Sequence, residues 1–237
     1  MKTRFLRQYG LILIMLCALT GCVDEQEDYI SKYCPGSCTE ITGRISSGIN
    51  RQAMQNVQLT ATWKNLQPVF GGGTIRKKAV AKTDQQGNYT LRFLLRDDEL
   101  QDGYIEIQYG IDNGKYLDCR EGSAVHSGEL KRDTTYTLDM YFPQRAYLSL
   151  ELTNPQDMAP SDRFFSTIKY PSGSAPGRTC GYVFSWHGTS TTTQTAPVAA
   201  GDTVIIHKSG SKGGVQIVDS DTLTLSPGEQ RVFKITF

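Results

Sequence analysis

Apolar residues recur at every second position through most of this chain, and this spacing restricts the fold more than any other feature. Val57, Leu59, Ala61 and Trp63 share one side of an extended backbone, while polar residues occupy the alternate positions. A repeat of two residues is typical of a β-strand with one buried face. The alternation returns in further stretches: 89–93, 105–111, 136–142, 146–152, 180–187 and 232–237. No convincing helical repeat accompanies them, so we expect an all-β protein.

The alternating stretches divide into two sets near residue 143. The first set is complete at Phe142, and Phe142-Pro143-Gln144-Arg145 precedes a new alternating stretch. Beyond it, prolines at 155, 160, 171 and 176 break the chain into short elements, as in an all-β unit joined by turns. We therefore expect two consecutive β-sandwich domains, at 39–143 and 144–237.

The first 22 residues have the order of a secretory signal peptide. Three basic residues precede an apolar run at 11–19, which is shorter than the roughly 20 residues that a membrane-spanning helix needs. The following Leu19-Thr20-Gly21-Cys22 resembles the lipobox of bacterial lipoproteins. That resemblance implies a signal peptide at 1–21, cleavage before Cys22, and a diacylglyceryl (palmitate-type) group on its thiol. The protein would then be anchored in a membrane through lipid alone.

The segment after Cys22 is acidic, and we assign residues 22–38 to a lipidated tether. Four of the five residues 24–28 are Asp or Glu, and no apolar repeat is present to fold them. A solvated tether accounts for this composition. Acids directly after the lipid-bearing cysteine also resemble the surface-export signal of Bacteroidetes lipoproteins. We expect an outer-membrane protein displayed at the cell surface, with the periplasmic face as the alternative.

The charge balance argues against a nucleic-acid partner. Removing residues 1–21 from the 237-residue chain leaves 216 and takes away three basic residues, so 22 Lys and Arg face 24 Asp and Glu. The mature chain is then close to neutral, at −2. It lacks the concentrated basic surface that phosphate binding needs. The oligomeric state leaves no mark in the sequence.

Three motifs in the first domain resemble the carboxypeptidase regulatory-like, or transthyretin-like, β-sandwich. They are Ile41-Thr42-Gly43-Arg44-Ile45, Asn56-Val57-Gln58-Leu59, and the hairpin Thr83-Asp84-Gln85-Gln86-Gly87-Asn88-Tyr89. The chain departs from the family in a long insert at 67–82 and in lacking the Pro-Gly that often precedes the second strand. The resemblance covers about residues 39–142. It implies a non-catalytic accessory or adhesion module without an active site.

Four cysteines remain in the mature chain besides Cys22: Cys34, Cys38, Cys119 and Cys180. An even number in an exported protein suggests disulfides, and four cysteines allow three pairings. Pro-Gly between Cys34 and Cys38 indicates a turn. We favour a bond that closes this turn, and hold Cys119 with Cys180 as the second pair. A zinc site using all four cysteines is the alternative, although Cys119 and Cys180 lack the paired spacing of zinc knuckles.

A glycine-rich and basic stretch lies in the insert. Gly71-Gly72-Gly73 leads to Arg76, Lys77 and Lys78. The spacing differs from that of a phosphate-binding P-loop, and no helix-forming sequence follows. The simplest interpretation is a mobile loop that leads into an exposed basic strand. Among exposed stretches this one is our first candidate for contacting an acidic partner.

The strand expected at 180–187 carries aromatic residues on one side. If exposed, Tyr182 and Trp186 would form a flat platform for stacking sugar rings, and they are our candidate glycan-binding residues. The opposite side offers only Val183 as a large apolar group. Burial tendencies therefore favour an aromatic side that faces the core. Trp63, aligned with Leu59, has the same interpretation.

No catalytic or metal-binding motif is visible. His126, His187 and His207 are the only histidines, and none lies in a zinc-protease motif or beside a nucleophile elbow. We expect no catalytic residues, no metal and no cofactor. The sequence favours a lipid-anchored envelope protein that acts as a binding or scaffolding module. The alternatives are a carbohydrate-binding accessory subunit of a glycan-uptake system and an adhesin or fimbria-associated component. An enzyme would instead need a pocket with several convergent titratable groups.

Overall fold

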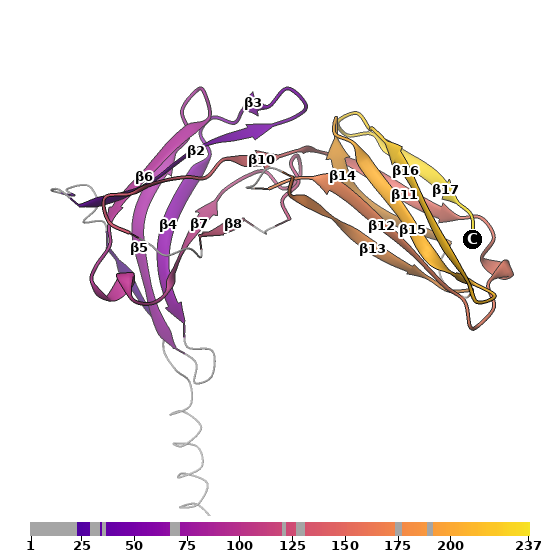
Figure 1. Cartoon of the computed structure of the whole chain (residues 1–237). Coiled ribbons are helices and arrows are strands. Elements are labelled where there is room, and N and C mark those ends of the chain that lie inside the picture. Colours follow the sequence, from indigo (N-terminus) through magenta and orange to yellow (C-terminus); the bar gives the residue numbers. More distant parts are fainter. Residues whose placement is uncertain are drawn as a thin grey trace, which may run out of the picture.

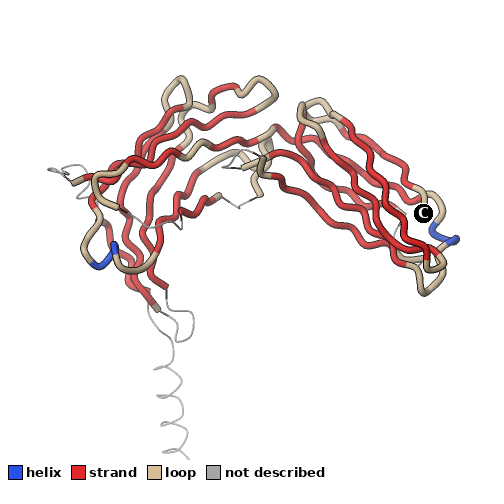
Figure 2. Tube along the Cα trace, viewed as in Figure 1, coloured by secondary structure: helices blue, strands red, loops and turns tan. Residues whose placement is uncertain are grey.

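The computed structural model describes residues 23–28, 34, 37–66, 72–119, 122–126, 131–173, 177–188 and 192–237. Strands run through both halves of the molecule (Figure 2). The helical elements among the described residues are two short 3-10 turns, η2 (Asp98–Leu100) and η3 (Pro155–Asp157). The expected all-β sandwich fold is therefore confirmed. Cys22, on which the lipoprotein prediction rests, lies outside the described residues.

Two sheets form the first lobe, which we define as residues 23–142 (Figure 1). One sheet has the strand order β1-β5-β4-β7-β8, and in the other β2 pairs with β6, β9, β10 and β3. The strands are β1 (Val23–Glu27), β2 (Cys38–Ser47), β3 (Gln52–Ala53), β4 (Gln58–Leu66), β5 (Gly73–Lys82), β6 (Asn88–Leu94), β7 (Tyr104–Tyr109), β8 (Ser123–His126), β9 (Thr135–Thr137) and β10 (Met140–Phe142).

The alternation in the sequence places an apolar face of each sheet in one core. Leu59, Ala61 and Trp63 of β4 are buried there, as the spacing of two predicts. The glycine at position 43 in β2 is not explained by alternation. A Cβ at this position would lie 2.1 Å from the carbonyl oxygen of Leu138. The glycine of the family-like motif is therefore required by the close passage of a neighbouring chain segment.

Two further sheets form the second lobe, residues 144–237. A three-stranded sheet of order β14-β11-β17 faces a four-stranded sheet of order β13-β12-β15-β16. The strands are β11 (Gln144–Leu152), β12 (Arg163–Pro171), β13 (Thr179–Trp186), β14 (Thr193–Ala200), β15 (Val204–Lys212), β16 (Val215–Leu223) and β17 (Gln230–Ile235). This lobe has a hydrophobic core of its own. The expected boundary at 143/144 falls between β10 and β11.

The segment after β7 reaches from the first lobe into the second. The backbone N–H of Leu117 donates to the carbonyl of Pro143 at 2.9 Å, and the Leu117 side chain is buried in the second core. Two residues farther on, Cys119 is disulfide-bonded to Cys180 of β13. A covalent bond and a buried side chain thus connect the lobes at this side of the joint.

The other side of the joint is held by hydrogen bonds around Tyr141 in β10. Tyr141 and Gly173 exchange two backbone hydrogen bonds of 3.0 Å each. The Tyr141 hydroxyl donates to a carboxylate oxygen of Asp202, and the guanidinium of Arg51 lies 3.4 Å from the centre of its ring. Contacts on both sides therefore restrict bending at the joint.

Candidate functional site

The acidic segment after Cys22 is a strand. Residues 23–27 form β1, which pairs in parallel with β5 so that Gln26 lies beside Arg76 and Glu27 beside Lys77. Lys77 Nζ also lies 2.8 Å from a carboxylate oxygen of Glu25. The expectation of a solvated tether is therefore wrong for residues 23–27. An apolar repeat is not needed here, because backbone hydrogen bonds and opposite charges hold the segment to a strand already in place.

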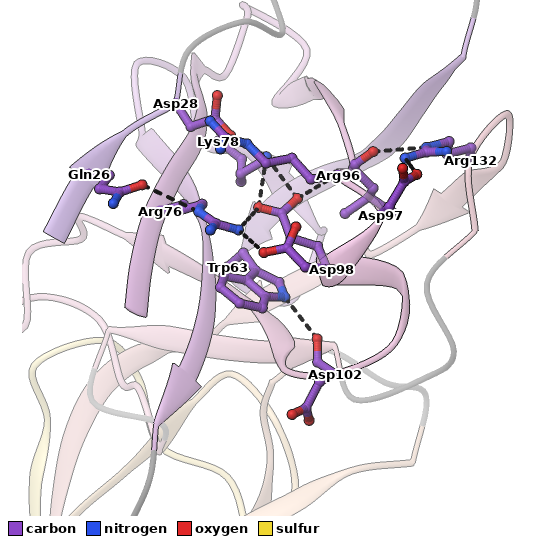
Figure 3. A network of polar contacts seen from close by, with 12 residues as sticks. Gln26, Asp28, Trp63, Arg76, Lys78, Arg96, Asp97, Asp98, Asp102 and Arg132 are labelled. Atoms are coloured by element: carbon purple, nitrogen blue, oxygen red, sulfur yellow. Dashed lines mark hydrogen bonds and ion pairs between the residues drawn. The ribbon is translucent and has the colours of Figure 1, made fainter. Parts of the chain in front are cut away.

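A buried ammonium group lies at the end of this pairing. Lys78 of β5 is 1% exposed, and its Nζ lies 2.6 Å from Asp28 Oδ2 and 2.8 Å from Glu99 Oε2 (Figure 3). Both carboxylates are buried as well. Charged groups taken out of water need such partners, because an unpaired buried charge is strongly unfavourable.

A β-bulge explains why Lys78 points inward. Ala61 of β4 faces Ala79 of β5, but the next residue, Thr62, faces Lys77, so Lys78 is the extra residue in the ladder. A bulge redirects the side chain of the inserted residue. Lys78 and Ala79 are both buried as a result, whereas a regular strand would place one of them outward.

Two arginines complete the group, which we call the Lys78 cluster: Asp28, Arg76, Lys78, Arg96, Asp98 and Glu99. Arg96 Nε donates to Asp28 Oδ2 at 2.9 Å. Arg76 Nη1 donates to Asp98 at 2.8 Å and to Glu99 at 3.1 Å, and its guanidinium lies 4.9 Å from the centre of the Trp63 ring. The cluster fastens β1 and η2 to β5.

Hydrogen bonds in the cluster lower the pKa of two of its carboxyl groups, those of Asp28 and Asp98. Burial by itself would raise the pKa of Asp28, but hydrogen bonds from Arg96 and Lys78 outweigh it and hold that pKa below its usual value. A hydrogen bond from Arg76 likewise lowers the pKa of Asp98. Opposite charges that lie this close favour each other's ionised form, and here they hold β1 and η2 against β5.

These contacts bear on the three basic residues that we expected to meet an acidic partner. For Lys78 the expectation of an exposed basic strand is wrong, because its ammonium is buried between two carboxylates. Arg76 faces Asp98 and Glu99, whereas Lys77 stays partly exposed beside Glu25. The acidic stretch 24–28 and the basic stretch 76–78 were both visible in the sequence, and their opposite charges could have suggested the pairing.

The aromatic strand is part of the second core. Trp186 is 0% exposed, and its indole Nε1 donates to Ser166 Oγ at 3.0 Å. Trp63 is 2% exposed, and its Nε1 donates to the carbonyl of Asp102 at 3.1 Å. The core-facing interpretation is confirmed for both residues, and the sugar platform is wrong for Trp186.

Tyr182 differs from its neighbours on the strand. It is 38% exposed and lines a shallow pocket of about 250 Å³ together with Cys119, Arg145 and Tyr170. Burial and its contact with Tyr182 raise the pKa of the Tyr170 hydroxyl. Tyr182 therefore remains a predicted ligand-contacting residue, without an aromatic partner beside it that is equally exposed.

The disulfides have the expected pairing. Cys34 bonds to Cys38 with their Cα atoms 5.5 Å apart, and Cys119 bonds to Cys180 with a Cα separation of 6.1 Å. Both separations lie in the normal range for disulfides. The four-cysteine zinc site is thereby excluded. Within the described part of the chain, no cluster of three or more His, Cys, Asp or Glu side chains could hold a metal ion.

A pocket of about 480 Å³ opens at the joint between the lobes. No feature of the sequence indicated it, because its walls come from separate turns and strand ends. Its polar lining consists of Ser46, Arg51, Thr137, Asp139, Tyr141, Ser172 and Arg178.

Comparisons with known proteins give no family. No protein-family model matches the chain, and no curated protein matches it. Among the helices of the described residues, none is long and apolar enough to cross a membrane.

Three solved structures illustrate what the chain is similar to. A streptococcal ancillary pilin has 11% identity and a TM-score of 0.33 over 83% of this chain and 63% of that chain. A shaft pilin SpaA from Lactobacillus rhamnosus GG (D295N mutant) has 7% identity and a TM-score of 0.32, and the match covers 84% of this chain and 98% of that chain. Catechol 1,2-dioxygenase from Pseudomonas arvilla C-1 has 11% identity and a TM-score of 0.26, and the match covers 52% of this chain and 58% of that chain. This chain thus spans less than two thirds of the ancillary pilin and of the dioxygenase. With TM-scores below 0.5, these likenesses carry no argument about function.

Proposed function

We propose that the protein is a lipid-anchored component of a bacterial outer membrane, displayed at the cell surface, that acts by binding or scaffolding and without catalysis. The joint between the lobes is the observation that carries this proposal. The Cys119–Cys180 disulfide and the two Tyr141–Gly173 hydrogen bonds connect two β-sandwiches that have separate cores. A body whose halves keep a fixed arrangement suits display and assembly.

The position of β1 supports the same function. β1 begins at Val23, the residue after the proposed lipid site, and the Lys78 cluster fastens its end to the first lobe. With Cys22 lipidated, the folded body would start directly at the membrane surface. Two or three acyl chains at that site would hold it there.

Substitution of Cys22 tests the anchor. In Cys22→Ala cells the protein should leave the membrane fraction, because position 22 no longer has a thiol to carry lipid. The matched control is Cys17→Ala, which changes another cysteine of the first 22 residues and should stay in membranes. Retention of Cys22→Ala in membranes would refute the anchor. Protease treatment of intact cells then distinguishes surface display, which predicts cleavage, from the periplasmic face.

An adhesin or fimbria-associated component is the second candidate, and exposed strand edges favour it. β16 and β17 are edge strands of the second lobe. They carry exposed valines at 215, 218 and 232, which are 69%, 69% and 58% exposed. Exposed edges of this kind can pair with a strand of another protein. The rival role in carbohydrate uptake through stacked aromatics loses its main support, because Trp63 and Trp186 are buried.

Substitutions on β16 and β17 distinguish the adhesin role from binding or scaffolding in general. Val218→Lys and Val232→Lys should abolish protein–protein cross-links formed on intact cells, since a lysine discourages edge pairing. Ile205→Lys is the control, because Ile205 is 38% exposed but lies on β15, where it pairs with β12 on one side and with β16 on the other. If the edge variants give the same cross-links as the parent protein, contact through these edges is excluded.

A further inference from the structure

The joint pocket contains two arginines without an ion-pair partner among the described residues. Arg51 comes from the turn between β2 and β3, where its guanidinium lies 3.4 Å from the centre of the Tyr141 ring. Arg178 precedes β13 and packs against Gly173, where a Cβ would lie 2.8 Å from Arg178 Cδ. Two positive groups from different lobes therefore border one cavity.

The negative groups nearby are already engaged. Asp139 lines the pocket, and its Oδ1 accepts the backbone N–H of Arg44 at 2.8 Å. Asp202 accepts the Tyr141 hydroxyl and is not among the lining residues. Two arginines and one aspartate leave one formal positive charge in the lining.

Ser172 gives a second, independent indication of a ligand. It is 4% exposed and lines the pocket, yet its Oγ has no hydrogen-bond partner. Buried hydroxyls in folded proteins nearly always have a partner, so each exception calls for an explanation. A ligand in the pocket would supply the missing hydrogen bond.

Arg51 is also held in an uncommon backbone conformation. Its φ is 51°, which few residues other than glycine adopt. Strain of this kind is often found at ligand-binding positions. The turn therefore presents the Arg51 side chain to the pocket at a cost in backbone energy.

We propose that the joint pocket binds an acidic carbohydrate, with a carboxylate or sulfate group held between Arg51 and Arg178. Guanidinium groups bind such planar or branched oxyanions through paired, charge-assisted hydrogen bonds. The hydroxyls of Ser46, Thr137 and Ser172 can exchange hydrogen bonds with sugar hydroxyls. The volume of about 480 Å³ falls in the usual range for small-molecule sites.

The lining favours a polyhydroxylated ligand over an aromatic one. Arg51 covers a face of the Tyr141 ring, and that face cannot also stack on a base. The wholly apolar side chains in the lining are Met140 and Pro171, and hydroxyl groups come from Ser46, Thr137, Tyr141 and Ser172. The carboxyl terminus of a peptide shares the acidic chemistry but not the hydroxyls, and it is the competing class in the test.

The test titrates the full mature protein by calorimetry with four probes. They are oligogalacturonate, galactose 6-sulfate, neutral galactose, and a short peptide with a free carboxyl terminus. We expect saturable binding of one or both acidic saccharides and none of neutral galactose. Whichever acidic probe binds more tightly identifies carboxylate or sulfate as the group recognised.

Three variants locate the binding. Arg178→Gln should weaken acidic-saccharide binding by about tenfold or more, as expected for a lost charge-assisted hydrogen bond. Ser172→Ala should weaken binding while leaving the unfolding midpoint unchanged or higher, because its Oγ has no partner in the fold. Arg92→Gln is the control, since Arg92 is an exposed arginine paired with Glu40 on the first lobe, and it should bind as the parent does.

Several results would overturn the proposal. They are failure of both acidic saccharides to bind at tens of millimolar, equal binding of neutral galactose, and tighter binding of the peptide. Parental affinity in both Arg178→Gln and Ser172→Ala would place any binding elsewhere. These outcomes leave the membrane anchor and the scaffolding role untouched, because neither depends on the pocket.

Discussion

Replacing Lys78 by methionine tests whether the Lys78 cluster holds β1 and η2 on the first lobe. Methionine keeps much of the apolar stem but removes the ammonium, which lies 2.6 Å from Asp28 and 2.8 Å from Glu99. Asp28 then keeps Arg96 at 2.9 Å, and Glu99 keeps Arg76 at 3.1 Å. Removing one partner of a buried ion pair costs about 3–5 kcal/mol. Because each carboxylate retains one cation, we expect about 3 kcal/mol, the lower end of that range.

The two tryptophans of the chain make the measurement specific to one lobe. Trp63 lies in the first core and Trp186 in the second. In a Trp186→Phe background, fluorescence during urea unfolding reports on Trp63 alone. With a urea dependence of about 1–3 kcal/mol per molar, a loss of 3 kcal/mol lowers the midpoint by about 1–3 M.

Lys82→Met is the matched control for this measurement. Lys82 lies on the same strand as Lys78, but it is exposed and has no ion pair among the described residues. A surface change of this kind should alter the free energy of unfolding by no more than about 0.5 kcal/mol. If Lys78→Met also stays within about 0.5 kcal/mol of the parent, the cluster does not stabilise the lobe and the reasoning fails.

Three further predictions concern pH, the core and the joint. The pKa of Asp28 is held below its ordinary value of 3.8, so its contribution is complete above about pH 4 and disappears as pH falls through the lower folded-state value. Urea midpoints of the first lobe should therefore decline in acid, and less steeply in Asp28→Asn; parallel pH curves would argue against this. Trp186→Ala should lower the free energy of unfolding of the second lobe by about 3–5 kcal/mol, measured by near-ultraviolet circular dichroism during denaturation. If the second lobe of Trp186→Ala were as stable as that of the parent protein, Trp186 would have to be exposed. Cys119 and Cys180 are separated by 61 residues, for which the chain-entropy treatment of disulfides gives about 4 kcal/mol. Replacing both by serine should lower stability and broaden the interlobe distances seen by small-angle X-ray scattering, whereas an unchanged scattering profile would show that the hydrogen bonds alone fix the joint.

Which side of each strand is buried could be predicted from the sequence. Leu59 and Trp63 are spaced by an even number of residues, and so are Phe184 and Trp186. In an extended backbone such residues share a face, whatever the partner strand is. The position of Trp186 on the inner side of β13 could therefore be predicted without knowing the rest of the fold. The bond between Cys34 and Cys38 could also be predicted from the sequence, because its two cysteines are only four residues apart.

Pairings between distant segments could not be predicted in this way. β1 pairs with β5 across about 50 residues of sequence, and the acidic composition of residues 24–28 suggested a tether when considered alone. The inward position of Lys78 depends on a bulge in the β4–β5 ladder. A bulge shifts the register by one residue and so reverses the faces that alternation predicts.

The sequence by itself determined the all-β class and the inner faces of the strands. It also predicts an export signal with a lipid site. Each of these depends on residues that are neighbours in the chain. The tertiary structure decided that the acidic segment is a strand, that Lys78 is buried, and that Arg51, Ser172 and Arg178 border one pocket. Those arrangements depend on which distant segments meet, and this is set by the free energy of the whole fold and not by any local repeat.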